Sequence, residues 1–466
     1  MSLSRRSALI AGSTGLSLLF AGGVVWRAVS TGVFRTDDDA AYEPWREWAN
    51  TPLDAPYGGP LAAVRAGILA ASAHNTQPWL FDIGTDRISI HADRSRHLGA
   101  VDPFHRELHL SIGCAIANME LAARAAGFDP TIEMMSGRLT DPRLAIDAAL
   151  QAANTEAKSA EDGQVGWMET VPTFGSPPVV AQLHLTRAMA ERSPLLDAID
   201  MRHTHRGPYD GARAVPPAVN AAMQAEIGDG SPPLKLFLFE RCDARFERLG
   251  RLIVAATERI VADPAMSADS ARWFRFDRSQ VLARRDGVTL DSVGLPAMTA
   301  ALAKLMPGTP LPEETDQQWL RATREVQVAT APLLGMIAVG DLYDLPNTLA
   351  AGRLWQRLHL LLTANGIVAQ PLNQPVEIVD RERVLGREPA MAPALAQLIE
   401  SGAMLPGDEA ESGAVGLDAL VQGAAGSDAF DPGAIAWRPT FVFRAGYADR
   451  RATASPRRSI EDVLIG

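Results

Sequence analysis

The sequence predicts an α+β protein whose chain repeats one arrangement of strands and helices in two halves. Residues 111–127 and 351–366 are both rich in small side chains with helical spacing, and both runs end at a glycine. Each run follows a stretch with strand pattern. Before the first run, apolar and polar residues alternate at 79–83 and 87–92 around Gly-Thr-Asp, which predicts a β-hairpin. Internal repetition of this kind indicates duplication, so we expect two pseudo-repeated halves.

Length, composition and charge limit the number of domains and exclude several classes of function. A chain of 466 residues is long enough for roughly two to four domains, and 47% hydrophobic with 21% charged residues is typical of a globular protein. The net charge of −11 argues against a nucleic-acid partner, because such binding depends on clustered Lys and Arg. Only three lysines occur, so we expect arginines to hold any anionic ligand, and we expect neither a Schiff-base lysine nor a P-loop.

The cysteines and histidines do not predict a metal site. Cys114 and Cys242 are the only cysteines, which is too few for a disulfide framework or a thiolate cluster. His105 and His109 have the i, i+4 spacing of two ligands on one helix face. Their order, His-Arg-Glu-Leu-His, differs from the His-Glu-x-x-His of metalloproteases, and no third ligand is evident. We therefore expect no bound metal.

Residues 1–30 have the features of a targeting segment. Ser-Arg-Arg-Ser-Ala-Leu at 4–9 precedes an apolar, glycine-containing stretch that runs to Trp26, which resembles a twin-arginine export signal. The alternatives are an ordinary secretory signal or a membrane anchor, since no Ala-x-Ala site follows and the apolar run is nearly long enough to span a bilayer. We expect export by the twin-arginine route to a periplasmic or membrane-anchored location, with a linker at 31–58.

The first half is expected at residues 59–178. An Ala- and Leu-rich stretch at 59–71 predicts a helix, which the hairpin follows. A long helical pattern at 103–127 ends at a glycine suited to a C-cap. Residues 150–178 are polar and contain Pro and Gly, so we expect them to bridge the two halves.

The second half is expected at residues 179–466, where helical and strand patterns again alternate. The expected elements are a helix at 180–201, a strand at 232–240, a helix at 243–262, a buried strand at 331–340, a helix at 348–366 and a strand at 438–444. Two stretches have no evident counterpart in the first half. Residues 263–325 form an insertion that we expect to cover a site, and the acidic residues 406–436 predict a surface loop.

One segment has the chemistry of a ring-binding turn. Residues 72–79 read Ser-Ala-His-Asn-Thr-Gln-Pro-Trp. Small and amide-bearing residues in a turn allow close backbone approach and offer hydrogen bonds, both of which a flavin ring requires at its polar edge. The alternative interpretation is that Asn75 and Gln77 only cap backbone groups, and Trp79 is expected in the core in either case.

A second segment has the chemistry of a phosphate-binding site. Residues 202–206 read Arg-His-Thr-His-Arg, and side chains at i, i+2 and i+4 of an extended segment point to one side. A buried phosphate dianion requires several charge-assisted donors. A further cation near the C-terminus, Arg457 or Arg458, would complete such a set. The alternative is a solvated basic turn that closes a helix.

Together the two segments resemble the FMN site of the nitroreductase family, whose Ser-x-x-Asn-x-Gln-Pro-Trp pattern the first segment matches. A diffuse likeness to a bacterial subgroup of fused nitroreductase-like proteins extends over roughly residues 60–466. The resemblance implies a nitroreductase-like fold whose two halves form an intramolecular dimer. Because each half carries only one segment, it also implies a single composite FMN site. The cofactor-binding residues that it implies are Ser72, His74, Asn75, Gln77, Arg202, Thr204, Arg206, Pro371, Leu372, Asn373, Arg457 and Arg458.

The same resemblance implies an activity. It is that of an FMN-dependent oxidoreductase, which passes hydride through the flavin to nitro or quinone-like small molecules. The chain would act as a monomer, and no side chain is expected to serve as acid or base. The family's usual Glu-Gly pair is absent at 371–373. Two alternatives remain open: a flavin-binding or flavin-sequestering protein without turnover, whose site the 263–325 insertion shuts, and a flavin-free scaffold.

Overall fold

The computed structural model describes residues 39–53, 59–141, 176–228, 230, 232–305, 311–400 and 436–465. The predicted export signal, residues 31–38 and 54–58 of the linker, most of the bridge between the halves, and nearly all of the predicted acidic loop lie outside the described residues. Among the residues that are described, no helix is both long and apolar enough to cross a membrane.

The first sheet is antiparallel and contains the predicted hairpin. Its strands, in spatial order, are β1 (Trp79–Ile83), β2 (Arg87–Ala92), β4 (Val179–Arg187) and β3 (Phe128–Met134). In the hairpin, Trp79 lies opposite Ala92 and Ile83 opposite Ile88, and Trp79 is fully buried as expected.

The helix predicted at 180–201 is wrong, because residues 179–187 form strand β4. Ala181, Leu183 and Leu185 alternate with polar residues and are all buried, which is the period of a strand with one face on the core. β4 pairs with β2 and β3. The first sheet therefore extends past residue 178, where the first half was predicted to end.

The second sheet has the same topology as the first. Its strands, in spatial order, are β5 (Leu234–Glu240), β8 (Leu333–Val339), β10 (Arg438–Gly446) and β9 (Val368–Pro371). In both sheets the order along the chain is first, second, fourth, third, and all neighbours are antiparallel. The predicted strands at 232–240, 331–340 and 438–444 are confirmed.

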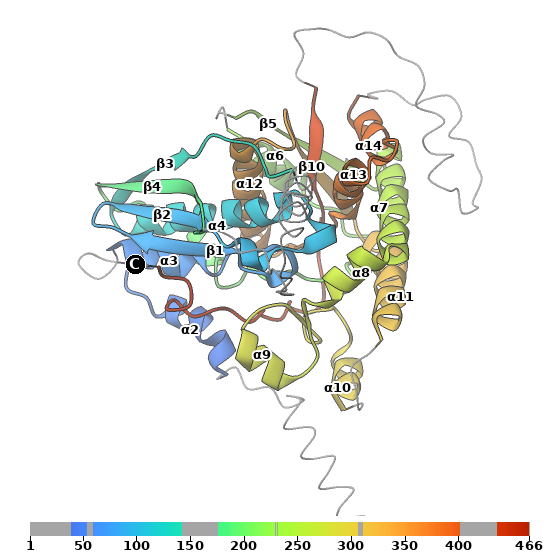
Figure 1. Ribbon diagram of the computed structural model, residues 1–466, viewed down its shortest axis with the longest axis horizontal. Helices are drawn as coiled ribbons and strands as arrows, with labels where there is room; N and C mark the ends of the chain where they lie inside the picture. Colours follow the sequence, from blue (N-terminus) through green and yellow to red (C-terminus); the bar gives the residue numbers. More distant parts are fainter. Residues whose placement is uncertain are drawn as a thin grey trace, which may run out of the picture.

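Two long helices join the second and third strands of the two sheets. They are α4 (Arg106–Ala125) and α12 (Leu345–Ala364), each 20 residues long. Each is followed by a glycine in the left-handed region, Gly127 (φ +80°) and Gly366 (φ +70°), which ends the helix as the sequence predicts. Figure 1 shows the two helices side by side in the middle of the molecule, where they pack directly on each other.

The 263–325 insertion is mostly helical. Its elements are α8 (Pro264–Ala271), β6 (Phe274–Arg275), α9 (Arg278–Arg284), β7 (Val288–Thr289), α10 (Ala297–Leu305) and α11 (Pro312–Ala322). In Figure 1, α9 and α10 lie at the bottom of the view, away from both sheets. The other α-helices of the described residues are α2 (Glu43–Ala49), α3 (Gly59–Gly67), α6 (Pro217–Ala225), α7 (Ala244–Ala262), α13 (Gln374–Val384) and α14 (Met391–Glu400).

Candidate functional site

The turn between α3 and β1 is held in an unusual backbone conformation. His74, Asn75 and Gln77 have φ values of 47°, 57° and 53°, a left-handed region that costs free energy for residues other than glycine. The turn is fixed from two sides. Ser72 Oγ accepts the Gln77 backbone N–H at 3.1 Å, and the Ala73 N–H donates to a hydroxyl of α4 at 3.0 Å. Strain maintained by such contacts is typical of a functional site.

Asn75 connects the turn to two distant segments. Its side-chain amide donates to the Gly287 carbonyl of the insertion at 3.2 Å and to the Pro456 carbonyl near the C-terminus at 3.0 Å. Its carbonyl oxygen accepts from Arg457 Nη1. This one buried side chain therefore binds both segments to the turn.

Gln77 makes a parallel set of contacts. Its Nε2 donates to the Arg285 carbonyl at 2.8 Å, and its Oε1 accepts the Arg458 backbone N–H at 2.8 Å. His74 contacts the insertion as well, with its Nε2 3.1 Å from Ser270 Oγ. Thus each of the three left-handed residues of the turn contacts the insertion through its side chain.

The insertion is also held on the turn by a buried ion-pair network. Asp286 pairs with Arg275, at 2.9 Å from Nε and 2.6 Å from Nη2, and also with Arg96. Arg96 donates through its Nε to the Thr76 carbonyl. This network links the turn to the insertion through charged groups.

Arg202 and Arg457 converge on the end of α3. Arg202 Nη2 donates to the Leu69 carbonyl at 3.1 Å, and Arg457 Nη2 donates to the carbonyls of Leu69 at 3.3 Å and Ala70 at 3.2 Å. Both arginines are only 2% exposed. Carbonyls at a helix C-terminus carry partial negative charge, which favours cations there.

These two cations have no anionic partner in the described part of the chain. Neither has a carboxylate within ion-pair distance, and the Nε of each is buried without a hydrogen-bond acceptor. Burial lowers the pKa of Arg202 to about 10, and burial with the neighbouring Arg202 lowers that of Arg457. Two like charges in a dry interior are costly, so the geometry suits an anion that bridges them.

Arg206 lies beside the turn, under the insertion. Its Nη1 donates to the Ser292 carbonyl at 3.0 Å, and burial lowers its pKa to about 10. Burial, and then the charge of Arg206, lower the pKa of His74 to about 4. The insertion packs tightly here, since a Cβ on Gly294 would lie 2.5 Å from the Arg206 carbonyl carbon. Thr204 lies on the same segment and is half-buried.

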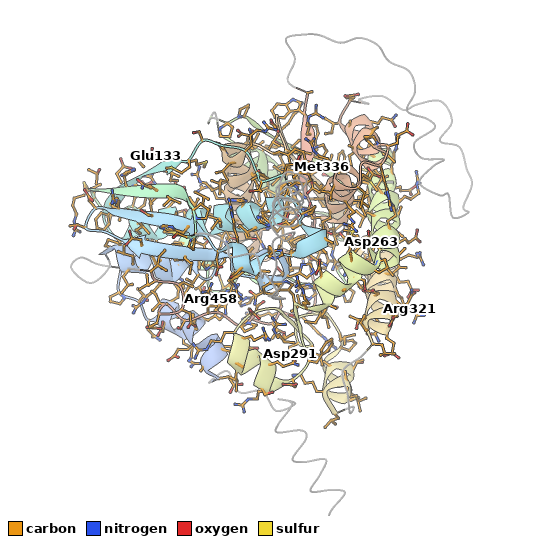
Figure 2. The ribbon with its side chains drawn as sticks, in the orientation of Figure 1. Glu133, Asp263, Asp291, Arg321, Met336 and Arg458 are labelled. Carbon is orange, nitrogen blue, oxygen red and sulfur yellow. The ribbon has the colours of Figure 1, made fainter. Side chains whose placement is uncertain are left out.

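Arg458 differs from the other predicted cations. Its Nη1 donates to the Gln77 carbonyl at 3.1 Å, and it lies 3.6 Å from a carboxylate oxygen of Asp93. It also lines a cavity of about 640 Å³ together with residues of α9. Figure 2 shows Arg458 below the first sheet, on the side of α9. Because Asp93 already balances its charge, Arg458 is less suited to hold an anion than Arg202 or Arg457.

Segment 371–373, at the end of β9, lies beside segment 202–206. The His205 N–H donates to the Ala369 carbonyl at 3.2 Å, which joins residues 202–206 to this strand. Leu372 N–H donates to the Val442 carbonyl at 2.8 Å, while Asn373 Oδ1 accepts the Val442 N–H at 3.0 Å. Pro371 pairs with β10.

Segment 371–373 and the turn contact one face of α4, a helical turn apart. Asn373 Nδ2 donates to Glu107, whereas the turn contacts Ser111, one helical turn further along. The structure thus brings together the predicted residues of the turn, of segment 202–206 and of the C-terminus. It places Asn373 against Glu107, one helical turn along α4 from the contact of the turn with Ser111.

Several residues of the site carried no sequence signal. The insertion contacts the turn largely through the carbonyls of Arg285 and Gly287, and α3 contributes the carbonyls of Leu69 and Ala70. Backbone carbonyls are present in every residue, so no residue type indicated them. Glu107 was also missed, although an acidic residue in the apolar pattern of a long helix was a usable signal. In the described residues, no group of three or more His, Cys, Asp or Glu could hold a metal.

Comparison with known proteins gives only distant structural likenesses. No protein-family model matches the sequence, and no curated protein matches it. Among solved structures, the FMN-dependent nitroreductase NfnB from Mycobacterium smegmatis in complex with NADPH is 14% identical, with a TM-score of 0.31, over 58% of this chain and 96% of that one. The FMN and NADPH-dependent nitroreductase NfnB from Sphigopyxis sp. strain HMH is 15% identical, with a TM-score of 0.33, over 58% and 98%. The nitroreductase-like family protein from Bacillus cereus is 10% identical, with a TM-score of 0.27, over 59% and 96%. Likenesses at this level assign neither a family nor an activity to this chain.

Proposed function

We propose that this chain binds one FMN and acts as an FMN-dependent oxidoreductase of the nitroreductase type, with nitro or quinone-like small molecules as acceptors. The observation that carries the proposal is the convergence of Arg202 and Arg457 on the Leu69 carbonyl. Two buried guanidinium groups meet there without a carboxylate among the described residues, and each has an unpartnered Nε. They lie beside a strained turn whose Asn75 contacts Arg457 directly.

The residues present fit a phosphate monoester. A phosphate dianion would balance the two buried positive charges and accept hydrogen bonds from the unpartnered Nε groups. The planar guanidinium group of arginine matches the geometry of phosphate oxygens. Arg206 and Thr204 lie on the same segment as Arg202 and would add further donors. The convergence of Arg202 and Arg457 supports these two as phosphate ligands. Arg206 and Thr204 are proposed from their place on the same segment, and Arg458 is secondary because Asp93 already balances it.

The ring end of the cofactor would lie against the turn and segment 371–373. Ser72, His74, Asn75 and Gln77 present hydroxyl, imidazole and amide groups there, and the left-handed backbone exposes main-chain polar groups. Bound FMN supplies hydride exchange at its N5, and the protein supplies binding, orientation and electrostatics. The insertion packs on the turn and thereby excludes water from this region.

We propose one site per chain rather than two. The two sheets share one strand order, and α4 and α12 occupy equivalent places, so the chain holds in one molecule what two subunits of a homodimer would contribute. Residues 59–71 lack an Arg-x-Thr-x-Arg run, and residues 228–240 lack an Asn-x-Gln-Pro-Trp run. Only one place therefore combines both segments, and the protein would act as a monomer with an internal dimer.

A second function follows from the same geometry. The insertion contacts the turn and segment 202–206 directly, through Gly287 on Asn75, Arg285 on Gln77 and Ser292 on Arg206. A site closed in this way favours a protein that binds or sequesters flavin without turnover. Rapid turnover with a nitro or quinone acceptor would exclude this alternative.

The proposal includes export by the twin-arginine route, which carries folded proteins and therefore allows the cofactor to be inserted before export. Its support is the Ser-Arg-Arg-x-x-Leu segment at residues 4–9. Replacement of both arginines by lysine is expected to retain the protein in the cytoplasm, and unchanged export would contradict this part of the proposal.

The test of the cofactor is direct. Purified protein should show the visible absorption of oxidised flavin, and FMN released by denaturation should equal the protein in molar amount. A ratio near two would exclude the composite site. Protein that neither retains nor rebinds FMN would leave the flavin-free scaffold as the remaining interpretation.

A further inference from the structure

A cluster of buried acidic groups lies at the N-terminal end of α4, next to Asn373. Its carboxyl groups come from the loop before α4, from the first turn of α4 and from one face of α13, and all four residues are at most 8% exposed. They are Asp102, Glu107, Glu377 and Asp380. A single buried cation, Arg106, accompanies them and is 0% exposed.

Two of the four carboxylates have full sets of partners. Asp102 accepts the backbone N–H groups of Glu107 at 3.0 Å and Leu108 at 2.9 Å, at the N-terminus of α4. Asp380 accepts from Arg106 Nε at 2.8 Å and from the hydroxyl of Tyr343 at 2.9 Å. These contacts stabilise both groups in their ionised form.

The carboxyl groups of Glu107 and Glu377 lack such full sets of hydrogen-bond and ion-pair partners. Arg106 Nη2 lies 3.5 Å from Glu107 Oε1, but its Nε is already committed to Asp380. Glu377 has no ion-pair or side-chain hydrogen-bond partner among the described residues. It follows Asn373 by four residues, and its backbone N–H donates to the Asn373 carbonyl at 3.1 Å. Residues four and seven positions after Asn373 share its helix face, so Glu377 and Asp380 both face Arg106 and Glu107.

The orientation of the Asn373 side chain determines the hydrogen-bonding role of the Glu107 carboxyl group. Because Asn373 Oδ1 accepts the Val442 N–H, its Nδ2 is the donor toward Glu107. Glu107 Oε1 is therefore an acceptor, which leaves its second oxygen free to carry or share a proton. Burial, and then the nearby carboxyls, raise the pKa of Glu107 to about 7 against the effect of Arg106. Burial and then Glu107 raise the pKa of Glu377 well above its usual range.

We propose that Glu107 and Glu377 share one proton at neutral pH and act as positioning residues that keep the Asn373 edge of the site from carrying two negative charges. Two ionised carboxylates in this dry interior, with one arginine already paired, would repel each other strongly. The proposal deepens the proposed function and rests on it only for its effect on FMN. Electrons added at the site increase the negative charge there, and the pair then takes up a second proton from solvent.

The charged and titratable groups that face the pair are few. They are Arg106 on α4, Asp102 before α4, Asp380 on α13 and Tyr343 before α12, and Arg383 stacks over the Tyr343 ring at 4.4 Å. Arg106 stays charged because its carboxylate neighbours raise its pKa further. Burial raises the pKa of Asp102 and of Asp380 as well, but Arg106 and hydrogen bonds to both carboxylates oppose that rise. Glu107 and Glu377 lack such full sets of partners, so they are the groups that we expect to hold the proton.

The pair is tested first on FMN-free protein. Infrared spectra at neutral pH should show the carbonyl band of a protonated carboxylic acid, and Glu377→Gln should remove it. Glu382→Gln is the matched control: Glu382 is equally buried on the same helix, but it pairs with Arg259. The control should retain the band. Absence of the band in the unmodified protein would overturn the proposal whether or not FMN binds.

Stability against pH gives the second readout. A carboxyl whose pKa is raised on folding loses stabilisation as pH rises from its ordinary range through its folded pKa. Unfolding of the native chain should therefore become easier over this range, and Glu377→Gln should flatten the profile. Glu382→Gln should lower stability at every pH and keep the slope. If Glu377→Gln does not fold, Glu107→Gln gives the same test, and parallel profiles would overturn the proposal.

The effect on the cofactor is measured separately. The midpoint potential of bound FMN should depend less on pH in Glu377→Gln than in the native chain, while the Glu382→Gln potential should follow the native one. An unchanged pH dependence in Glu377→Gln would overturn the positioning role. Failure of any form to bind FMN would contradict the proposed function, whereas the infrared and stability results would still decide whether the proton is shared.

Discussion

Gly113 of α4 and Gly352 of α12 contact each other's helix backbone. A Cβ on Gly113 would lie 2.2 Å from the Leu349 carbonyl oxygen, and a Cβ on Gly352 would lie 2.0 Å from the Leu110 carbonyl oxygen. Each glycine stands seven residues after the first residue of its helix, 106 to 113 and 345 to 352. The contact is therefore reciprocal, as in the isologous interface of a symmetric dimer, and it lets the two central helices approach closely.

We expect Gly113→Ala to destabilise the protein strongly. The added methyl group meets backbone atoms of α12, which cannot rotate away, and overpacking of this kind costs about 1–3 kcal/mol or more. Gly352→Ala should behave alike, because its contact is equivalent. Denaturant unfolding measures both. Gly230→Ala, where a Cβ meets nothing within 4 Å, is the control. Native-like stability of Gly113→Ala would show that the helices can separate without loss.

Arg202→Leu is expected to weaken FMN binding while leaving the folded state intact. The variant removes a charged donor to phosphate, which costs about 1.5–3 kcal/mol, or at least roughly tenfold in affinity. In FMN-free protein it also removes one of two buried, uncompensated charges, so stability should not fall by more than about 1 kcal/mol. Titration with FMN and thermal unfolding measure the two effects. Arg138→Leu changes an exposed arginine paired with Asp341 and is the control. Equal FMN affinity in both variants would refute the phosphate assignment.

The ion pairs of Asp286 are expected to keep the insertion on the turn. Asp286→Asn weakens the contacts to Arg96 and Arg275 and should loosen the cover over Asn75 and Gln77. Bound FMN should then be reduced faster by dithionite and by NAD(P)H. Asp291→Asn, which breaks a pair with Lys304 elsewhere in the insertion, is the control. If both variants and the native chain are reduced at one rate, the insertion does not gate access.

His74 is expected to make the protein less stable in acid. Its pKa is lowered from 6.5 to about 4, first by burial and then by Arg206. Between pH 6.5 and 4 the imidazole is therefore protonated in the unfolded chain and neutral in the folded chain. The stabilisation of the folded state that is present above pH 6.5 is lost as pH falls toward 4. The loss is on the order of 1–3 kcal/mol. Unfolding should be measured across this range for His74→Asn, since asparagine tolerates the left-handed backbone. His184→Gln, on the surface of β4, is the control.

The outcome for His74→Asn can be separated from that of other histidines. His105 and His109 also have pKa values lowered to about 4, mainly by burial. The variant should therefore reduce the acid sensitivity and not abolish it. A profile identical to that of the native chain would mean that His74 is not kept neutral by its surroundings.

The sequence alone determined the elements whose signals are local. The hairpin at 79–92, the long helices and their terminal glycines, and the strands at 234–240, 333–339 and 438–446 follow from periodicity and capping, which act over a few residues. The prediction of a helix at 180–201 overlooked the apolar–polar alternation of residues 181–185, which has the period of a strand. Pairing with β2 and β3 then fixes this strand in the first sheet.

In the candidate site, too, some residues were predictable from the sequence, whereas their contacts depend on the tertiary structure. Residue types indicated the turn at 72–77, the cations at 202–206 and Arg457, because amides and arginines are uncommon in apolar surroundings and mark polar ligands. Tertiary structure decided that Arg202 and Arg457 share the Leu69 carbonyl, and that Asn75 joins the insertion to the C-terminal segment. It also decided that Asn373 faces Glu107. These contacts join residues far apart in the chain, several through main-chain carbonyls, so no local pattern of residue types determines them.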